Sequence, residues 1–176
     1  MSPSFHHLYL TGYRGSGKTS VGKWLEGKLL RPVVDLDDRI EHAAGMSIRE
    51  IFEREGEAGF RNRESAALLA VSEEKPSIVS LGGGAILRKE NRQIIASSGF
   101  CVWLKVDVDT VLHRLAQDTT TAGRRPSLTS LPAREEVLTV LTARESIYAS
   151  VANGQIDATH NSIQAAGEAL LMLLPG

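Results

Sequence analysis

The sequence of 176 residues has little cysteine and no disulfide partner for the cysteine that it has. Cys101 is the single cysteine, which excludes an intramolecular disulfide and a cysteine-rich metal site. It lies in the apolar run 100–104, with no base beside it in the sequence. We therefore expect a buried core thiol and not a nucleophile.

Excess charge and long apolar runs are also missing. The chain carries 20 Lys and Arg against 21 Asp and Glu, so its formal net charge of −1 gives no general attraction to nucleic acid or to an anionic membrane. No apolar run approaches the length of a membrane span, and residues 1–7 lack the pattern of a secretory signal. We expect a cytoplasmic protein without a membrane or nucleic-acid partner, in which His6 and His7 form a solvated pair at a strand edge.

What the sequence does contain is a phosphate-binding pattern. Residues 12–19, GYRGSGKT, match G-x-x-x-x-G-K-[ST] at every position, between a strand-like run at 8–10 and a helix-like segment at 20–30. The glycines let backbone N–H groups converge on an anion at a helix N-terminus. Lys18 would reach the β- and γ-phosphates of a nucleotide, and the Thr19 hydroxyl would bind magnesium (Mg2+).

Strand-like and helix-like segments alternate along the chain, which is typical of a parallel sheet with crossover helices. The predicted fold class is α/β, a three-layer fold with a five-stranded parallel sheet flanked by helices, formed by a single domain over residues 1–176. The predicted strands are 8–10, 32–35, 77–81, 100–106 and a weak fifth at 154–157.

The connection between the second and third predicted strands is longer than a crossover requires. A helix at 37–44 ends at Gly45, a capping box at 47–50 opens a second helix that ends at Gly56, and a third covers about 60–71. The surplus, residues 37–59, is predicted to serve a separate purpose such as covering a second substrate.

Two groups of residues follow predicted strands at the carboxyl edge of the sheet, where ligands bind in open parallel sheets. Asp35 and Asp37 stand at the carboxyl end of the second strand, and alternation along a strand end sends residues two apart in a similar direction. One carboxylate could therefore hold Mg2+ while the other accepts a hydrogen bond from a substrate hydroxyl. Capping of the next helix explains one of these acids but not the pair. Gly82 to Gly84 follow the third strand and leave room for a ligand, although a flexible loop has the same composition.

The arginines are less specific on their own. Residues 117–130 form a polar segment that we predict to be a lid, because Arg124 and Arg125 stand together in it; a disordered surface loop is the alternative. Arg61 opens a helix and Arg144 lies in a late one. Each alone is most simply a solvated surface residue, or the partner of a nearby acid such as Glu64 for Arg61.

Taken together, these segments resemble the shikimate kinases, small members of the nucleoside-monophosphate-kinase-like group of phosphate-loop (P-loop) folds. Gluconate and adenylate kinases share the phosphate loop but not the stretch 45–64 or the triple glycine in this order. The segments that carry the resemblance are 12–19, 34–41, 45–64, 81–85, 125–128 and 144–148.

The resemblance implies ATP-dependent phosphorylation of the 3-hydroxyl of shikimate, on the route to chorismate and the aromatic amino acids, with a substrate-binding segment at 37–64 and a lid at 117–131. We expect the chain to work as a monomer. Which of Arg124 and Arg125 reaches the transferred phosphate stays open. The residues implied are, for catalysis, Lys18, Asp37 and Arg125; for ATP, Gly15, Ser16, Gly17, Lys18, Thr19, Ser20, Arg114 and Arg125; for Mg2+, Thr19 and Asp35; and for shikimate, Asp37, Arg61, Gly83, Gly84 and Arg144.

Two other functions are kept as alternatives. Another small-molecule kinase, such as a gluconate kinase, would keep the phosphate loop but needs no arginine pair for a carboxylate. A non-catalytic nucleotide switch would carry a D-x-x-G sequence after its third strand, where this chain has Gly82 to Gly84 instead.

Overall fold

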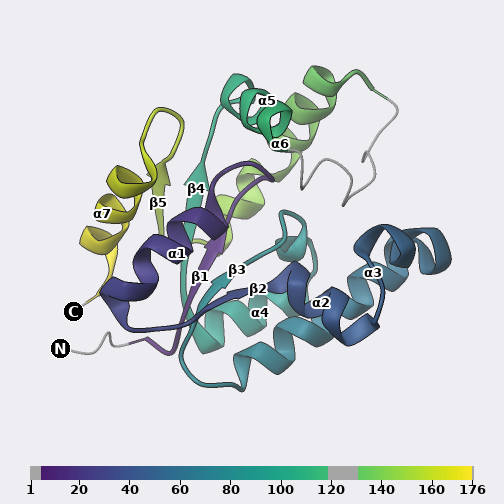
Figure 1. Ribbon diagram of the computed structural model, residues 1–176, viewed down its shortest axis with the longest axis horizontal. Helices are drawn as coiled ribbons and strands as arrows, with labels where there is room; N and C mark the ends of the chain where they lie inside the picture. Colours follow the sequence, from purple (N-terminus) through teal and green to yellow (C-terminus); the bar gives the residue numbers. More distant parts are fainter. Residues whose placement is uncertain (1–4, 119–130, 176) are drawn as a thin grey trace.

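The structure is a computed structural model that describes residues 5–118 and 131–175. Its centre is a parallel sheet in the order β2-β3-β1-β4-β5 with helices on both faces, which confirms the predicted α/β class and all five predicted strands (Figure 1). The strands are β1 His7–Thr11, β2 Val33–Asp35, β3 Ile78–Ser80, β4 Gly99–Lys105 and β5 Gly154–Asp157. The helices are α1 Lys18–Leu29, α2 Leu36–Ala44, α3 Ile48–Ser72, the 3-10 turn η1 Ala85–Leu87, α4 Lys89–Ser98, α5 Val108–Gln117, α6 Ala133–Val151 and α7 Ile163–Leu173.

The two faces of the sheet bury two separate cores. Successive strand residues point to opposite faces, so Leu8 and Leu10 of β1 enter the first core and Tyr9 enters the second. Helices α1, α5 and α7 cover the first core, and α2, α3 and α4 cover the second (Figure 1). Helix α6 contributes to both, with Val137 and Val140 in the first core and Tyr148 in the second.

The connection between β2 and β3 is built from the predicted helix signals. Gly45 ends α2 with φ 64°, and Ser47 forms the capping box with Glu50 at the start of α3. Gly56 has φ 68° and ψ −174°, which breaks α3 into two helical arms within one continuous element. The second arm begins directly after Gly56, earlier than the predicted start near residue 60.

The expectations for Cys101 and for the histidine pair have different outcomes. Cys101 is fully buried, and this burial raises the pKa of its thiol to about 12, as expected for an unreactive core cysteine. The expectation of a solvated histidine pair is wrong for His7. That side chain is buried, and its Nδ1 lies 3.0 Å from the Ser77 hydroxyl, because β1 is a central strand and not an edge strand.

Several predictions concern the residues between α5 and α6. The predicted lid at 117–131, together with Arg124 and Arg125, falls almost entirely outside the described residues.

None of the helices within residues 5–118 and 131–175 combines the length and the apolar character needed to cross a membrane.

Candidate active site

The phosphate loop connects β1 to α1 and is closed by its own lysine. Its glycines Gly12, Gly15 and Gly17 all have φ between 77° and 142°, a region that side chains other than glycine rarely adopt. The Lys18 ammonium donates to the carbonyl oxygens of Gly12 at 2.9 Å and Tyr13 at 2.8 Å. Lys18 is only 8% exposed, so its charge is held inside the loop.

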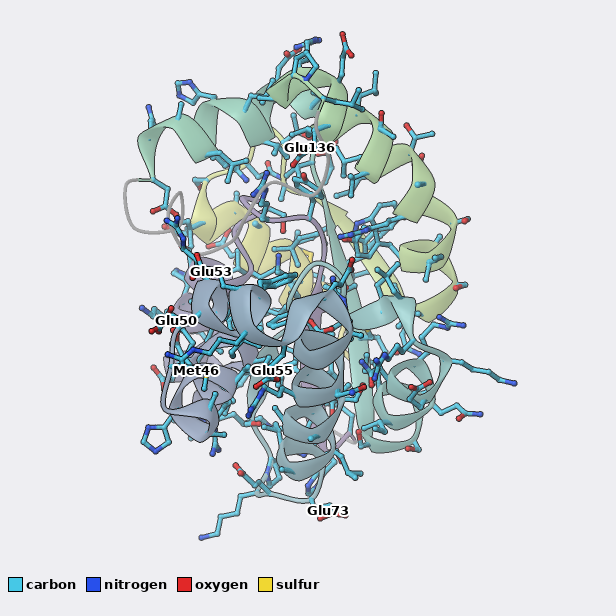
Figure 2. The ribbon with its side chains drawn as sticks, turned by 90° about the vertical axis from the view of Figure 1, so that its right-hand side faces the viewer. Met46, Glu50, Glu53, Glu55, Glu73 and Glu136 are labelled. Atoms are coloured by element: carbon cyan, nitrogen blue, oxygen red, sulfur yellow. The ribbon has the colours of Figure 1, made fainter. Side chains whose placement is uncertain are left out.

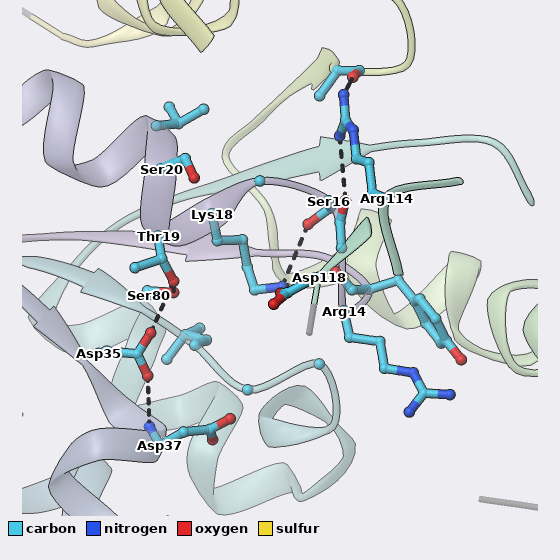
Figure 3. Close-up of a pocket in the computed structure, with 18 of the residues that line it drawn as sticks. Arg14, Ser16, Lys18, Thr19, Ser20, Asp35, Asp37, Ser80, Arg114 and Asp118 are labelled. Carbon is cyan, nitrogen blue, oxygen red and sulfur yellow. Dashed lines mark hydrogen bonds between the residues drawn. The ribbon is translucent and has the colours of Figure 1, made fainter. Parts of the chain in front are cut away.

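A cleft of about 650 Å³ lies at the carboxyl edge of the sheet, beside this loop (Figure 3). It brings together residues from elements that are far apart in the sequence. Gly84 lies behind this lining, against Arg61, and Arg125 lies outside the described residues. The predicted site residues that line the cleft are Gly15, Ser16, Gly17, Lys18, Thr19, Ser20, Asp35, Asp37, Arg61, Gly83, Arg114 and Arg144.

Asp35 connects the phosphate loop to the acidic end of β2. Its Oδ2 accepts a hydrogen bond from the Thr19 hydroxyl at 2.8 Å, and its Oδ1 accepts from the backbone N–H of Asp37 at 3.0 Å (Figure 3). Asp35 therefore caps α2 and also faces the loop. Asp37 lies in the first turn of α2, so the two carboxylates reach the cleft from a strand end and a helix, and not from alternate strand positions as the sequence argument assumed.

Burial is the main influence on the charge of Asp35. It raises the pKa of this carboxyl above its ordinary value, and the charges of Asp37 and Asp38 raise it further, while the hydrogen bond from Thr19 lowers it. A nearby cation would favour the ionised form. Mg2+ could supply this positive charge, because it prefers oxygen ligands such as the Asp35 carboxylate.

The oxygens around Thr19 fit Mg2+. The Thr19 and Ser80 hydroxyls lie 3.0 Å apart, and both belong to the same small group of oxygens as the Asp35 carboxylate. The described residues contain no cluster of three or more His, Cys, Asp or Glu side chains arranged for a metal ion. Mg2+ is usually held by one or two protein oxygens together with substrate phosphates and water. Sequence reasoning did not single out Ser80.

Arg61 of α3 lines the cleft and is buried there. It is 6% exposed and donates to Glu64 at 2.7 Å and to Glu57 at 3.5 Å. The solvated-surface reading of Arg61 is therefore wrong, although the ion pair with Glu64 is present. Glu64 is fully buried, since Phe60 and Leu68 of the same helix face belong to the second core.

The glycine loop after β3 fits closely around two arginines. A methyl group on Gly84 would lie 2.4–2.7 Å from the guanidinium atoms of Arg61, so a side chain at this position would displace that guanidinium. The Gly83 carbonyl accepts hydrogen bonds from Arg144 at 3.1 Å and from the Tyr148 hydroxyl at 2.5 Å. The solvated-surface reading is therefore wrong for Arg144 as well, because its side chain is half-buried against this loop.

Arg114 connects the phosphate loop to the segment after β5. Its guanidinium donates to the carbonyl oxygens of Gly15 at 3.2 Å and Ala158 at 2.7 Å. This position at the first-core side of the cleft is compatible with its predicted place against a nucleotide base. Sequence reasoning gave no role to Tyr148, although it lies in a segment that carries the family resemblance.

The sheet order, the phosphate loop and the cleft beside it define a P-loop small-molecule kinase. The model of the shikimate kinase family matches residues 14–174. A curated shikimate kinase from Rhodopirellula baltica is 54% identical over 157 residues, which cover 89% of this chain and 84% of the relative. Shikimate kinase 2 of Escherichia fergusonii is 41% identical over 94% of this chain and 91% of its own. The chain belongs to the shikimate kinase family.

Solved structures agree with this assignment. A shikimate kinase from Acinetobacter baumannii in complex with shikimate has a TM-score of 0.89 and 33% identity to this chain, and the match covers 97% of this chain and 93% of the other. A gluconokinase from Sinorhizobium meliloti has a TM-score of 0.64 at 20% identity, which shows a shared fold alone.

Proposed function

We propose that this chain transfers the γ-phosphoryl group of ATP to the 3-hydroxyl of shikimate. The observation that carries the proposal is the pairing of a complete phosphate loop with two arginines, Arg61 and Arg144, that meet a glycine loop in the same cleft. Membership of the shikimate kinase family supports the same acceptor. Two arginines are suited to bind the carboxylate of a ring substrate. A nucleotide switch needs no such arginine pair.

The donor half of the proposed site is the phosphate loop and its neighbours. Gly15, Gly17 and the start of α1 would receive the phosphates, Lys18 would offset their charge, and Arg114 would lie against adenine. Thr19 and Asp35, with Ser80, would hold Mg2+, which neutralises charge on the phosphates when bound. Phosphoryl transfer depends mainly on such positioning and charge neutralisation.

The acceptor half lies toward the second core. Asp37 would bind the shikimate hydroxyls and take the proton of the attacking one, while Arg61 and Arg144 would bind the carboxylate. Gly83 and Gly84 would supply backbone contacts. Closure of the segment 117–131 as a lid, with Arg125 on the phosphates, would exclude water that competes as acceptor.

The remaining assignments concern the domain organisation, the oligomeric state and the location of the chain. We propose one kinase domain over 1–176, with 37–64 as its substrate-binding segment, working as a monomer in the cytoplasm. The oligomeric part is tested by light scattering at assay concentration, where a mass of twice 19.1 kDa would contradict it.

The experiment that tests the function is ADP release with shikimate as acceptor, compared with gluconate and with no acceptor. We expect turnover with shikimate that depends on Mg2+, and phosphorus NMR of the product should show one phosphate ester at the 3-position. Equal turnover with gluconate, or ADP release without any acceptor, would overturn the assignment in favour of another kinase or a hydrolase.

The acceptor assignment has its own test in Arg61→Lys. Lysine keeps the positive charge but loses the planar fork that binds a carboxylate through two hydrogen bonds. We expect shikimate binding to weaken by roughly 1.5–3 kcal/mol, with little change in ATP binding. Calorimetry can titrate the two ligands separately, and unchanged shikimate affinity would show that Arg61 serves only its ion pairs with Glu57 and Glu64.

A further inference from the structure

An ion pair joins the phosphate loop to α6. Arg14 occupies a variable position of the loop, between Gly12 and Gly15, and its Nη2 donates to Glu136 Oε1 at 3.0 Å. The Arg14 side chain extends away from that of Lys18, although Arg14 also lines the cleft (Figure 3). Neither the phosphate-loop pattern nor the proposed roles above account for this contact.

Glu136 is a buried acid, unlike most acidic residues at a protein surface. It lies in the first turn of α6 on the inner side of the helix, and its side chain is 3% exposed against 29% for Arg14 (Figure 2). A buried carboxylate is retained only where charged or polar partners compensate its lost hydration. The pair with Arg14, whose side chain is 29% exposed, therefore joins the phosphate loop to α6 and contributes to this compensation.

The same two elements meet a second time at the glycine loop. Arg144 follows Glu136 on α6 by about two helical turns and donates to the Gly83 carbonyl. A methyl group on Gly83 would lie 3.6 Å from the backbone nitrogen of Arg14 and 3.4 Å from the Gly12 carbonyl. Each of these three segments, the phosphate loop, α6 and the glycine loop, therefore contacts the other two. Arg14 is the phosphate-loop residue that contacts α6.

We propose that Arg14 and Glu136 are positioning residues for phosphoryl transfer. Their ion pair fixes the position of α6 relative to the phosphate loop, so that Arg144 contacts the acceptor while the phosphate loop binds the donor. This inference rests on the proposed function, because it assigns Arg144 to shikimate. Displacement of reacting groups by about 1 Å can cost on the order of 100-fold in rate, so a small shift of α6 is enough to matter.

The first test is Glu136→Gln, which removes the buried charge and leaves a half-exposed arginine that water can solvate. We expect kcat to fall and KM for shikimate to rise, with kcat/KM for shikimate lower by about 10- to 100-fold. KM for ATP should stay within about twofold, since the loop's contacts to phosphate are unaltered. The matched control is Arg134→Gln on the same helix, whose ion pair with Asp109 is mostly exposed and whose kinetics should match the unmodified chain.

A double variant distinguishes action through Arg144 from a purely structural role of the ion pair. If the pair acts through Arg144, Glu136→Gln should change kcat/KM for shikimate by less than about twofold when Arg144 is already methionine, since coupled residues are non-additive. Unchanged kinetics in folded Glu136→Gln, full additivity with Arg144→Met, or a rise in KM for ATP alone would each overturn the proposal. If Glu136→Gln does not fold, the double variant Arg14→Met with Glu136→Gln, which buries no unpaired charge, is judged by the same criteria. Because every value is a ratio to the unmodified chain, failure of this inference is distinct from absence of shikimate phosphorylation.

Discussion

Lys18 shows how one side chain can serve both the structure and the proposed chemistry. Its ammonium closes the phosphate loop through the Gly12 and Tyr13 carbonyls, so the same charge that would meet a nucleotide also holds the loop in shape. Substitution of Lys18 therefore has two effects, one on phosphate charge and one on loop geometry.

We predict that Lys18→Met lowers kcat by on the order of 100-fold or more, because one charged contact to the transferred phosphate is lost. The melting temperature should fall only slightly, since the lysine belongs to neither hydrophobic core. Steady-state kinetics and circular-dichroism melting measure the two effects. Turnover within tenfold of the unmodified chain would contradict the assigned role.

Asp35 allows a prediction with opposite signs for stability and activity. Its pKa is raised above the ordinary 3.8, so the folded chain binds the proton more tightly there than the unfolded chain does. Stability therefore falls as pH rises from the unfolded to the folded pKa, and the ionised carboxylate is a cost at neutral pH. Asp35→Asn should raise or preserve the melting temperature at pH 7, since asparagine also caps helices well, and this gain should vanish toward pH 3.

Activity should respond in the other direction. Asp35→Asn should sharply lower phosphoryl transfer and raise the Mg2+ concentration needed for half-maximal rate, because an amide is a poorer Mg2+ ligand than a carboxylate. Melting curves from pH 3 to pH 8 and Mg2+ titrations measure the two properties. A destabilised variant with normal Mg2+ dependence would show that Asp35 serves α2 and not the metal.

Residue identity could be predicted from the sequence more readily than residue environment. Asp35, Arg61 and Arg144 were all found as candidates, yet each alone fitted a helix cap or a surface ion pair. What decides against the surface reading of Arg61 is its burial beside Gly84, and that depends on packing between α3 and a loop more than twenty residues further on. Local patterns carry no information on such long-range contacts.

At the scale of elements, strands and capped helices were predictable and two helices were not. The strands have apolar runs bounded by turn residues, and α3 has a complete capping box. Helix α4 begins with polar residues 89–93 and is held instead by side-chain bonds from Asn91 and Arg92 to the carbonyls of η1. Helix α7 contains a nearly continuous apolar stretch near its end, for which helical periodicity is hard to detect.

The glycine loop after β3 yields a prediction at this scale. Gly84→Ala should displace the Arg61 guanidinium, because the added methyl would overlap it, while the backbone of Gly84 needs no unusual φ. We expect shikimate affinity to fall by about tenfold or more. The melting temperature should fall as well, because Arg61 is also the partner of the buried Glu64 carboxylate. Gly27→Ala is the matched control, since no atom lies within 4 Å of its added methyl in α1. Equal shikimate affinity in both variants would contradict the predicted contact.

The whole molecule carries two tryptophans, one for each core. Trp24 of α1 packs against Gly167 of α7 beside the first core. Trp103 of β4 belongs to the second core and stacks on Tyr148 at a centroid distance of 5.6 Å, and Tyr148 in turn donates to the Gly83 carbonyl. The chain therefore has a separate optical reporter on each face of the sheet.

We predict that shikimate changes the emission of Trp103 and leaves that of Trp24 nearly unaltered. Titration of Trp24→Phe with shikimate should retain the fluorescence change of the unmodified chain, whereas Trp103→Phe should lose it. Binding measured by calorimetry in both variants separates loss of the signal from loss of affinity. A change that persists in Trp103→Phe would mean that shikimate does not act on the Tyr148 side of the cleft.

The long connection between β2 and β3 has a consequence for how such enzymes diverge. Asp37 and Arg61 both lie in this one continuous stretch, whereas the phosphate loop and Arg114 lie outside it. A kinase of this plan can therefore exchange much of its acceptor recognition by recombination of a single gene segment, with the nucleotide machinery inherited intact. Gly84 and Arg144 are then the positions at which a transplanted segment must still be made compatible with its new host.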